Sequence, residues 1–487
     1  MVHSVNALYS AAQIRQAEQV AIAEYAIAGL QLMRRAGQAT FDELVARWPT
    51  TRRIAVCCGG GNNGGDGYVV ARLALQAGMQ VKLMAIGDAA ALQNDALISH
   101  REFVALGGKV DDFDGEFETC DVIVDAVFGT GLNREVGEVY AGMIDAINAA
   151  DRPVLAVDLP SGLHADSGCV MGAAVKADVT VTFIGLKSGL FTGAAAEHCG
   201  QIVCSTLDVP EAVFASLPPV AHLLSPRRLP RRSRIAHKGH FGHVLLIGGN
   251  YGFSGAIRLA GEAALRSGAG LVSIVTRAGC GGWLNIGRPE LMCHGIETSA
   301  ELQSLLHKST VVVIGPGLGQ DDWARTLLNT VLESDKPCVV DADALNLLAQ
   351  FPHHRENWLL TPHPGEAARL LGCPSSEIAS NRYAAVARLQ RRFGGTCVLK
   401  GSGSLVADGD SLAVCPAGNP GMASGGMGDV LAGVSGALMA QGLPIGDAAK
   451  LAVYVHAAAA DLAAAEHGER GLLAGDLLFP IRQLLNQ

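Results

Sequence analysis

A glycine-rich stretch that leads into an apolar helix constrains this chain more than any other feature. Residues 419–433 read NPGMASGGMGDVLAG. Gly425, Gly426 and Gly428 tolerate positive φ angles and close backbone approach, so this part of the stretch predicts a loop. Small and apolar residues at 427–439 predict a buried helix. The N-terminus of such a helix offers unpaired N–H groups and a positive dipole end, which suit a phosphate.

Asp429 falls in the first turn of this predicted helix. At that position a carboxylate can accept a proton from a hydroxyl while the backbone N–H groups stabilise a phosphoryl group in transfer. The pattern therefore predicts phosphoryl transfer with Asp429 as the catalytic base. The structural alternative is a glycine turn that merely opens a helix, with an aspartate in its first turn.

Apolar runs alternate with helical stretches along most of the chain, which predicts parallel sheets covered by helices. With 487 residues the chain is too long for one core. The predicted fold is α/β, with two doubly wound three-layer α/β/α domains at residues 1–220 and 237–487. The proline- and arginine-rich segment 221–236 is interpreted as a linker, with a basic phosphate-binding patch as the alternative. The runs that predict strands are 54–58, 81–86, 122–127, 154–157 and 179–184, then 243–247, 271–276, 311–314, 338–340, 358–360 and 396–399.

Composition limits the classes of function. The formal charge of −9, from 37 basic and 46 acidic residues, argues against nucleic acid as a partner. The twelve cysteines include no CxxC pair and predict buried thiols in a reducing compartment. Neither a membrane span nor a signal peptide is expected, so a soluble cytoplasmic protein is predicted. Homo-oligomerisation stays open.

Polar residues in the first half follow the predicted strands. Residues 57–67 read CCGGGNNGGDG, which predicts a strand, a polar glycine loop and a helix that starts near Tyr68. Asp125 and Asp158 end two further strands, and Ser161 follows the second. Because ligands bind at the carboxyl ends of parallel strands, these residues should converge with Asn63 and Asp66. Their oxygen atoms suit a hard cation such as potassium or magnesium; simple helix capping is the structural alternative. Lys187 is either an acid or base in the same crevice or a surface lysine.

The motifs GGGNNGGDG, VDAVFGTGL and VDLPSGL together resemble the NAD(P)HX epimerase domain over about residues 10 to 215. The resemblance implies a Rossmann-like domain that interconverts R- and S-NAD(P)HX, with Asp158 and Lys187 as the candidate acid/base pair. It also implies potassium ligands at Asn63, Asp125 and Ser161. Arg34 departs from the family pattern, which is usually acidic there. The implied substrate-binding residues are Asn62, Asn63, Gly64, Gly65, Asp66, Gly129, Thr130, Gly131, Leu132, Asn133, Arg134, Glu135 and Asp158.

Short motifs also follow the predicted strands of the second half: GPGLG at 315–319, DADALN at 341–346, TPHPGE at 361–366 and KGSGS at 400–404. Lys400 and the glycines after it can hold a nucleotide phosphate by charge and backbone together. Glu366 is a candidate magnesium ligand, through water. His363, between two prolines at a strand end, is interpreted as a ligand contact, with a purely structural histidine as the alternative.

With NPGMASGGMGDVLAG, these motifs resemble the ADP- or ATP-dependent NAD(P)HX dehydratase of the ribokinase-like superfamily, from about His237 to Leu485. The resemblance implies a ribokinase-like domain with magnesium. It implies contacts to the hydrated dinucleotide from Ala256, Gly317, His363 and Asp429. The implied nucleotide-binding residues are Lys400, Gly401, Ser402, Gly403, Ser404 and Gly428.

Both resemblances imply one pair of metabolites, NADHX and NADPHX, and a bifunctional repair enzyme that uses ADP or ATP. NAD(P)HX carries a hydroxyl at C6 of its reduced ring, and phosphorylation would turn this hydroxyl into a good leaving group. Two alternatives remain. One is a ribokinase-like small-molecule kinase that keeps its phosphorylated product, fused to a dinucleotide-binding module. The other is a first half that serves only as a binding or scaffold module.

Overall fold

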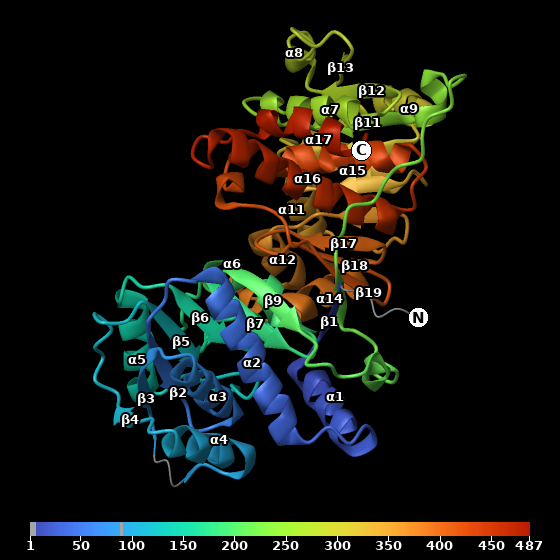
Figure 1. Cartoon of the computed structure of the whole chain (residues 1–487). Helices are drawn as coiled ribbons and strands as arrows, with labels where there is room; N and C mark the ends of the chain where they lie inside the picture. The colour runs from blue at the N-terminus through green and yellow to red at the C-terminus, as the bar shows by residue number, and fades with distance from the viewer. Residues whose placement is uncertain (1–5, 88–90) are drawn as a thin grey trace. The chain divides into compact units, whose positions relative to one another are not determined.

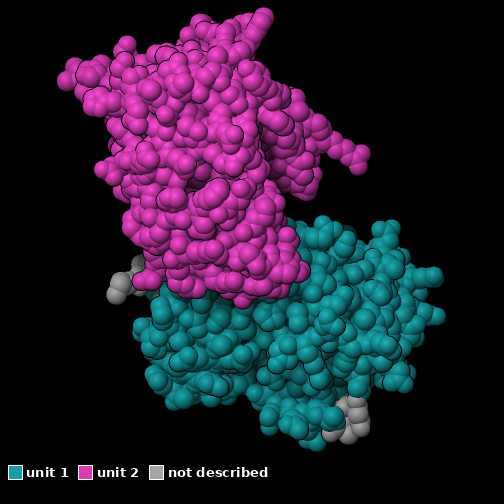
Figure 2. Space-filling view, turned by 180° about the vertical axis from the view of Figure 1, so that it is seen from behind, with its two compact units in different colours: residues 1–222 teal, residues 223–487 magenta. Residues whose placement is uncertain are grey.

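The chain divides into two compact units, Met1–His222 and Leu223–Gln487, which Figure 2 colours separately. This computed structural model describes residues 6–87 and 91–487. Each unit has a parallel sheet with helices between its strands, so the predicted α/β class is confirmed (Figure 1).

Unit 1 is built on a seven-stranded sheet with the order β4-β3-β2-β5-β6-β7-β9, in which all neighbours are parallel. A short β1 pairs with β8 and β10. The strands are β1 (Ala7–Tyr9), β2 (Arg53–Cys58), β3 (Gln80–Ala85), β4 (Val110–Asp112), β5 (Val122–Ala126), β6 (Val154–Val157), β7 (Val179–Phe183), β8 (Leu186–Lys187), β9 (Gln201–Ser205) and β10 (Ala221–Leu223). The helices are α1 (Ala11–Glu24), α2 (Gly29–Arg47), α3 (Asn62–Gln76), α4 (Asn94–Ala105), α5 (Glu138–Ala149) and α6 (Ala195–His198).

Both faces of the unit 1 sheet are buried. Val56 and Val124 belong to a cluster with apolar residues of α1 to α4. Their strand neighbours Cys57 and Ile123 point to the other face and belong to a second cluster with α5. Because side chains alternate along a strand, continuous apolar runs are what a sheet covered on both sides requires.

Unit 2 orders its strands β13-β12-β11-β14-β15-β16-β17-β18-β19, with β13 to β17 parallel and β18 and β19 antiparallel. Helices α7, α15 and α16 contribute to one large apolar cluster with these strands. The strands are β11 (His243–Ile247), β12 (Leu271–Thr276), β13 (Met292–Gly295), β14 (Val311–Ile314), β15 (Cys338–Val340), β16 (Trp358–Leu360), β17 (Thr396–Leu399), β18 (Leu405–Asp408) and β19 (Ser411–Val414). The helices are α7 (Ser254–Arg266), α8 (Ala278–Gly281), α9 (Ser299–Lys308), α10 (Asp322–Leu332), α11 (Ala342–Gln350), α12 (Pro364–Leu371), α13 (Ser375–Ser380), α14 (Arg382–Phe393), α15 (Met427–Ala440), α16 (Ile445–His467) and α17 (Leu478–Leu484).

One predicted boundary is wrong: α3 begins at Asn62, not near Tyr68. Gly64, Gly65 and Gly67, which suggested a longer loop, are inside the helix, where they allow close packing. A Cβ on Gly64 would lie 1.9 Å from the carbonyl oxygen of Gly59, and one on Gly67 would lie 2.6 Å from Cβ of Ala126. The sequence therefore uses glycine here to bring the helix against the sheet rather than to turn the chain.

Two further segments differ from simple expectation. By length and composition alone, α16 could cross a membrane, so the expectation that no stretch would meet these criteria was wrong. However, 61% of its apolar window is buried inside the protein, and Leu451 and Val455 belong to the unit 2 cluster. The helix is thus a core element. In the segment 221–236, which was expected to be a linker, the first residues form β10.

Candidate active sites

A cavity of about 630 Å³ lies at the carboxyl ends of the unit 1 strands. The predicted residues Asn62, Asn63, Asp66, Asp158 and Lys187 line it, together with the loop residues 129–134. Gly64, Gly65, Asp125, Ser161 and Glu135 are not among its lining residues.

A buried ion pair joins the two candidate acid/base residues of this cavity. Nζ of Lys187 donates to Oδ1 of Asp158 at 2.6 Å, to Oγ1 of Thr182 at 2.8 Å and to the carbonyl of Phe183 at 2.8 Å. Lys187 is 1% exposed, so it is not a surface lysine. An ammonium has three N–H donors, and all three are used, which fixes the ammonium beside Oδ1 of Asp158.

The backbone at Asp158 is unusual because its φ is +68°. Non-glycine residues rarely adopt the left-handed region of backbone conformation, and the few that do are concentrated at functional sites. The conformation directs the carboxylate toward the loop after β5, where the N–H of Thr130 donates to Oδ2 at 3.3 Å. A Cβ on Gly129 would lie 2.9 Å from that same oxygen and 3.2 Å from Oδ1 of Asn63. Asp158 and Asn63 therefore converge at Gly129.

The three residues expected to bind potassium lie beside this point. The Ser161 hydroxyl donates to Oδ1 of Asp125 at 2.5 Å, and the Ser161 N–H donates to Oδ2 at 2.7 Å. Burial raises the pKa of Asp125 to about 6, against the effect of these hydrogen bonds. Both polar atoms of the Asn63 side chain are buried and have no protein partner. Such unsatisfied atoms are costly unless a ligand pairs with them.

Two further carboxyl groups line the cavity. Burial raises the pKa of Asp66 above its usual range, and the nearby Asp158 adds to this. The same two causes raise the pKa of Glu18, which comes from α1. Sequence reasoning did not select Glu18, because it lies on an ordinary amphipathic helix outside the glycine motifs. Arg34, where the family is usually acidic, does not line the cavity and instead pairs with Glu102.

The candidate site of unit 2 is built by the residues that follow β15, β16 and β17. These are Asp341, Thr361 and Lys400, and the strands hold them in register. Nζ of Lys400 donates to Oδ1 of Asp341 at 2.7 Å, and Thr361 donates to the same oxygen at 2.8 Å. Oε2 of Glu366 is 4.0 Å from the same Nζ. Burial lowers the pKa of Lys400, but the two carboxylates outweigh it, so the net shift is upward.

The glycine loop brings Asp429 to this cluster. Gly426 is the N-cap of α15 with φ +92°, and Asp429 lies in the first turn, as predicted. A Cβ on Gly428 would lie 3.2 Å from Nζ of Lys400 and 3.6 Å from Oδ2 of Asp341. Burial, followed by the charge of Asp341, raises the pKa of Asp429 to about 7. A carboxyl poised at this pKa is suited to general base work near neutral pH.

His363 and Glu366 form the N-terminal capping box of α12. Nδ1 of His363 accepts from the N–H of Gly365 at 3.0 Å, and Oε2 of Glu366 accepts from the N–H of His363 at 2.8 Å. Both residues thus have a structural task. Burial and the charge of Asp341 raise the pKa of Glu366 to about 7, although Lys400 opposes this.

The remaining predicted residues of unit 2 lie in two loops. Residues 400–404 connect β17 to β18 in a turn in which the N–H of Gly401 donates to Oγ of Ser404 at 3.2 Å. Gly317 lies against Ala256, because a Cβ on Gly317 would be 3.2 Å from that of Ala256. Sequence reasoning quoted Asp341 within a motif but missed its role as the partner of Lys400. Its position directly after a buried strand was the available signal.

Two family models match the chain. Residues 244–482 match the model described as NAD(P)H-hydrate dehydratase, and residues 29–189 match the model described as YjeF-related protein N-terminus. A dehydratase structure from Bacillus subtilis, crystallised with ATP and magnesium, is 30% identical and covers 53% of this chain and 93% of its own, with a TM-score of 0.47.

Curated relatives match over almost the whole chain. The bifunctional NAD(P)H-hydrate repair enzyme Nnr of Coxiella burnetii is 49% identical over 485 residues, which are 98% of this chain and 99% of the relative. The enzyme of the same name from Escherichia coli K12 is 44% identical over 98% of this chain and 94% of the relative. The chain therefore belongs to the family of bifunctional NAD(P)H-hydrate repair enzymes.

Proposed function

We propose that this chain repairs NADHX and NADPHX with two active sites. Residues 1–220 form the epimerase domain, residues 221–236 the linker and residues 237–487 the dehydratase domain, which uses ADP or ATP. The observation that carries the proposal is Asp429, a half-buried carboxyl with a pKa of about 7, in the first turn of a helix entered by a glycine loop. A base of this kind beside unpaired helix N–H groups suits phosphoryl transfer to a hydroxyl.

In the dehydratase site, Asp429 accepts the proton of the C6 hydroxyl while that oxygen attacks the terminal phosphoryl group of the nucleotide. The P–O bond to the nucleotide breaks. The phosphorylated dinucleotide then loses phosphate through cleavage of its C6–O bond and a proton from the neighbouring ring carbon, which gives NADH or NADPH. Ala256, Gly317, His363 and Asp429 bind the hydrated dinucleotide. Lys400 to Ser404 and Gly428 hold the nucleotide, with Lys400 oriented by Asp341.

Magnesium is proposed at Glu366, bound through water. Glu366 is buried, lies near Lys400 and shares this region with Asp341, so oxygen donors of the type that magnesium prefers are present. The metal would supply charge neutralisation for the phosphates.

Asp429→Asn should reduce nucleotide-dependent dehydration by about 10²–10⁴-fold, because the amide cannot accept the hydroxyl proton. Nucleotide binding should remain, since Lys400 and its loop are unchanged. The decisive assay follows NADH absorbance and free phosphate together, with ADP, ATP or neither, and starts from each epimer of hydrated NADH. Phosphate and NADH should form in equal amounts. A stable phosphorylated product without NADH would instead identify a kinase.

The dehydration rate should rise with pH between about 6 and 8 and then level off, because a general base works only when ionised. The pKa of about 7 for Asp429 sets this window. Glu366 has a similar pKa, so the Glu366→Gln variant separates the two groups. It should keep the ascending limb and require more magnesium for half-maximal rate. A pH-independent rate in this variant would assign the limb to Glu366.

In the epimerase site, Asp158 and Lys187 are the proposed acid/base pair. Their ion pair is buried at the cavity wall, and the hydrogen bonds of Lys187 hold the carboxylate toward Gly129. The substrate is proposed to contact Asn62 to Asp66, the loop from Gly129 to Glu135, and Asp158. Gly64, Gly65 and Glu135 do not line the cavity, so we propose that they support the neighbouring residues that do.

Asp158→Ala should slow interconversion of the two epimers by about 10²–10⁴-fold. The measurement is cleanest in the Asp429→Asn background, where dehydration does not consume either epimer. Lys176→Met is a matched control, because Lys176 forms an exposed ion pair with Glu197 in the same unit. Epimerisation at the parent rate in Asp158→Ala would refute this role.

Potassium is proposed to bind Asn63, Asp125 and Ser161. The fit rests on oxygen donors alone, with the unpartnered Oδ1 of Asn63 among them. Groups of three or more histidine, cysteine, aspartate or glutamate residues able to hold a metal do not occur within residues 6–87 and 91–487. The ion would contribute positive charge beside Asp158.

Potassium chloride should raise the melting temperature of unit 1 by about 3 °C for each kcal/mol that potassium binding adds to the free energy of unfolding. Choline chloride at equal ionic strength should not raise it. Asn63→Ala should abolish the difference without loss of an existing hydrogen bond, because this amide has no protein partner. Equal shifts with both salts would indicate ionic strength alone and contradict the site.

A cytoplasmic location is also proposed. All twelve cysteines are free, as expected in a reducing compartment. The net charge of −9 agrees with small-molecule substrates rather than nucleic acid as ligands.

A further inference from the structure

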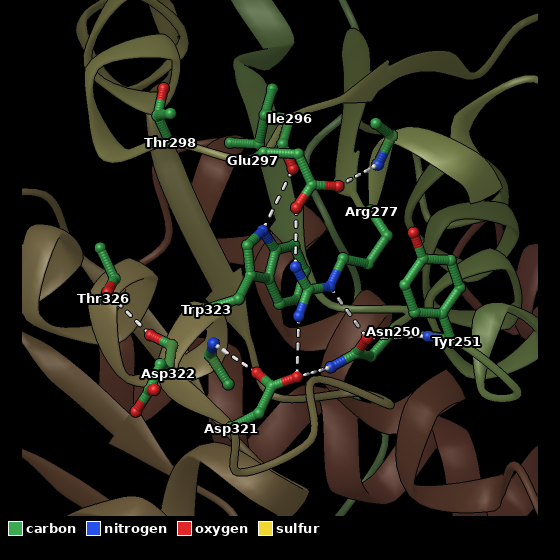
Figure 3. Close-up of polar contacts among 12 residues, drawn as sticks. Asn250, Tyr251, Arg277, Ile296, Glu297, Thr298, Asp321, Asp322, Trp323 and Thr326 are labelled. Carbon is green, nitrogen blue, oxygen red and sulfur yellow. Dashed lines mark hydrogen bonds and ion pairs between the residues drawn. The ribbon is translucent and has the colours of Figure 1, made fainter.

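Arg277, directly after β12, is held by three side chains and an aromatic ring (Figure 3). Its Nε donates to Oδ1 of Asn250 at 3.1 Å, Nη1 donates to Oε2 of Glu297 at 2.7 Å, and Nη2 donates to Oδ2 of Asp321 at 2.8 Å. The guanidinium also lies 4.6 Å from the ring centroid of Trp323. Each guanidinium nitrogen therefore has a protein partner, and only 16% of the side chain is exposed.

These partners come from neighbouring strand ends. Asn250 follows β11, Glu297 follows β13, and Asp321 caps α10 after β14. The strands are adjacent in the order β13-β12-β11-β14, so one side chain links four consecutive strand ends. A planar guanidinium suits this task because its donors point in fixed directions.

Asn250 transmits this arrangement to the loop Gly315–Gly319. The N–H of Asn250 donates to the carbonyl of Gly317 at 2.6 Å, and Nδ2 donates to the carbonyl of Leu318 at 3.1 Å and to Oδ2 of Asp321 at 3.0 Å. A Cβ on Gly319 would lie 2.8 Å from Nδ2 of Asn250. The amide can orient the loop only if its own rotation is fixed. Two donors hold its Oδ1: the N–H of Tyr251 at 2.8 Å and Nε of Arg277 at 3.1 Å, and of these only Arg277 also binds Asp321.

The loop in turn presents Gly317 to Ala256. Gly317 has φ +59°, and a Cβ there would lie 2.5 Å from the carbonyl oxygen of Phe253. The backbone of Gly317 therefore packs so closely against the start of α7 that there is no room for a side chain. Because two carboxylates already neutralise Arg277, this residue is suited to orienting the loop rather than to binding a substrate phosphate.

We propose that Arg277 is a positioning residue of the dehydratase site: through Asn250 and Asp321 it holds the loop Gly315–Gly319 so that Gly317 and Ala256 receive the hydrated dinucleotide. The proposal rests on the proposed function of this site. It adds a determinant of substrate affinity that is separate from the nucleotide loop Lys400–Ser404 and from Asp429.

The test compares steady-state constants for both substrates in Arg277→Lys, in the full-length chain. Lysine keeps the charge but cannot reach three partners at once. The KM for the hydrated dinucleotide should rise about tenfold or more, while the nucleotide KM stays unchanged and kcat changes by less than about threefold. A merely destabilising change would not separate the two KM values in this way.

Three companion variants identify the arm of the network that matters. Asn250→Ala removes the link to the loop and should reproduce the rise in KM. Glu297→Gln alters the arm that leads to β13, away from the loop, and should keep KM near the parent value. Arg325→Ala removes an exposed pair with Asp322 on α10 and should match the parent.

An unchanged dinucleotide KM in both Arg277→Lys and Asn250→Ala would overturn the proposal. A rise of equal size in the dinucleotide KM of Glu297→Gln would overturn it as well. So would a lower kcat in Arg277→Lys together with similar rises in both KM values. Failure of the proposed function looks different, because the parent chain itself would then form no NADH from hydrated NADH.

Discussion

Each unit depends on a lysine–aspartate ion pair placed where parallel strands end. Lys187 pairs with Asp158 in unit 1, and Lys400 pairs with Asp341 in unit 2, at 2.6 and 2.7 Å. Both pairs are largely removed from water. An uncompensated charge in such a place costs about 3–5 kcal/mol, so neither partner is readily replaced alone. The pairs allow charged side chains to exist beside apolar sheets, next to the groups for which we propose catalytic roles.

Burial then tunes the neighbouring acids. In unit 2, desolvation raises the pKa of Asp429 to about 7, and the charge of Asp341 adds to the shift. The same desolvation disfavours a charged Lys400, which Asp341 compensates. In unit 1 it raises the pKa of Asp66 and Glu18 around Asp158. The sheets place these groups together, and the loss of water adjusts their affinity for protons. Hydrogen bonds of Asn250 also join the loops that follow β11 and β14.

The family, the enzyme class and the α/β fold predicted from sequence are confirmed. Strand positions were predictable because strands buried on both faces are unbroken apolar runs; β11, β12 and β14 to β17 have the predicted bounds. Short strands such as β4 and β13 were missed, since they are partly exposed and lack such runs. The start of α3 was misplaced because a glycine needed for close packing has the same sequence signature as one needed for a turn.

The sequence by itself determined the alternation of strands and helices, the glycine loop before Asp429 and the residues at the strand ends, because these depend on local periodicity and backbone freedom. Tertiary structure alone decided that Lys187 is buried against Asp158, that Glu18 lines the same cavity, and that Arg277 joins four strand ends. The physical reason is that burial and ion pairing depend on residues far apart in the chain. The local sequence around a lysine does not distinguish one on the surface from one in a cavity wall.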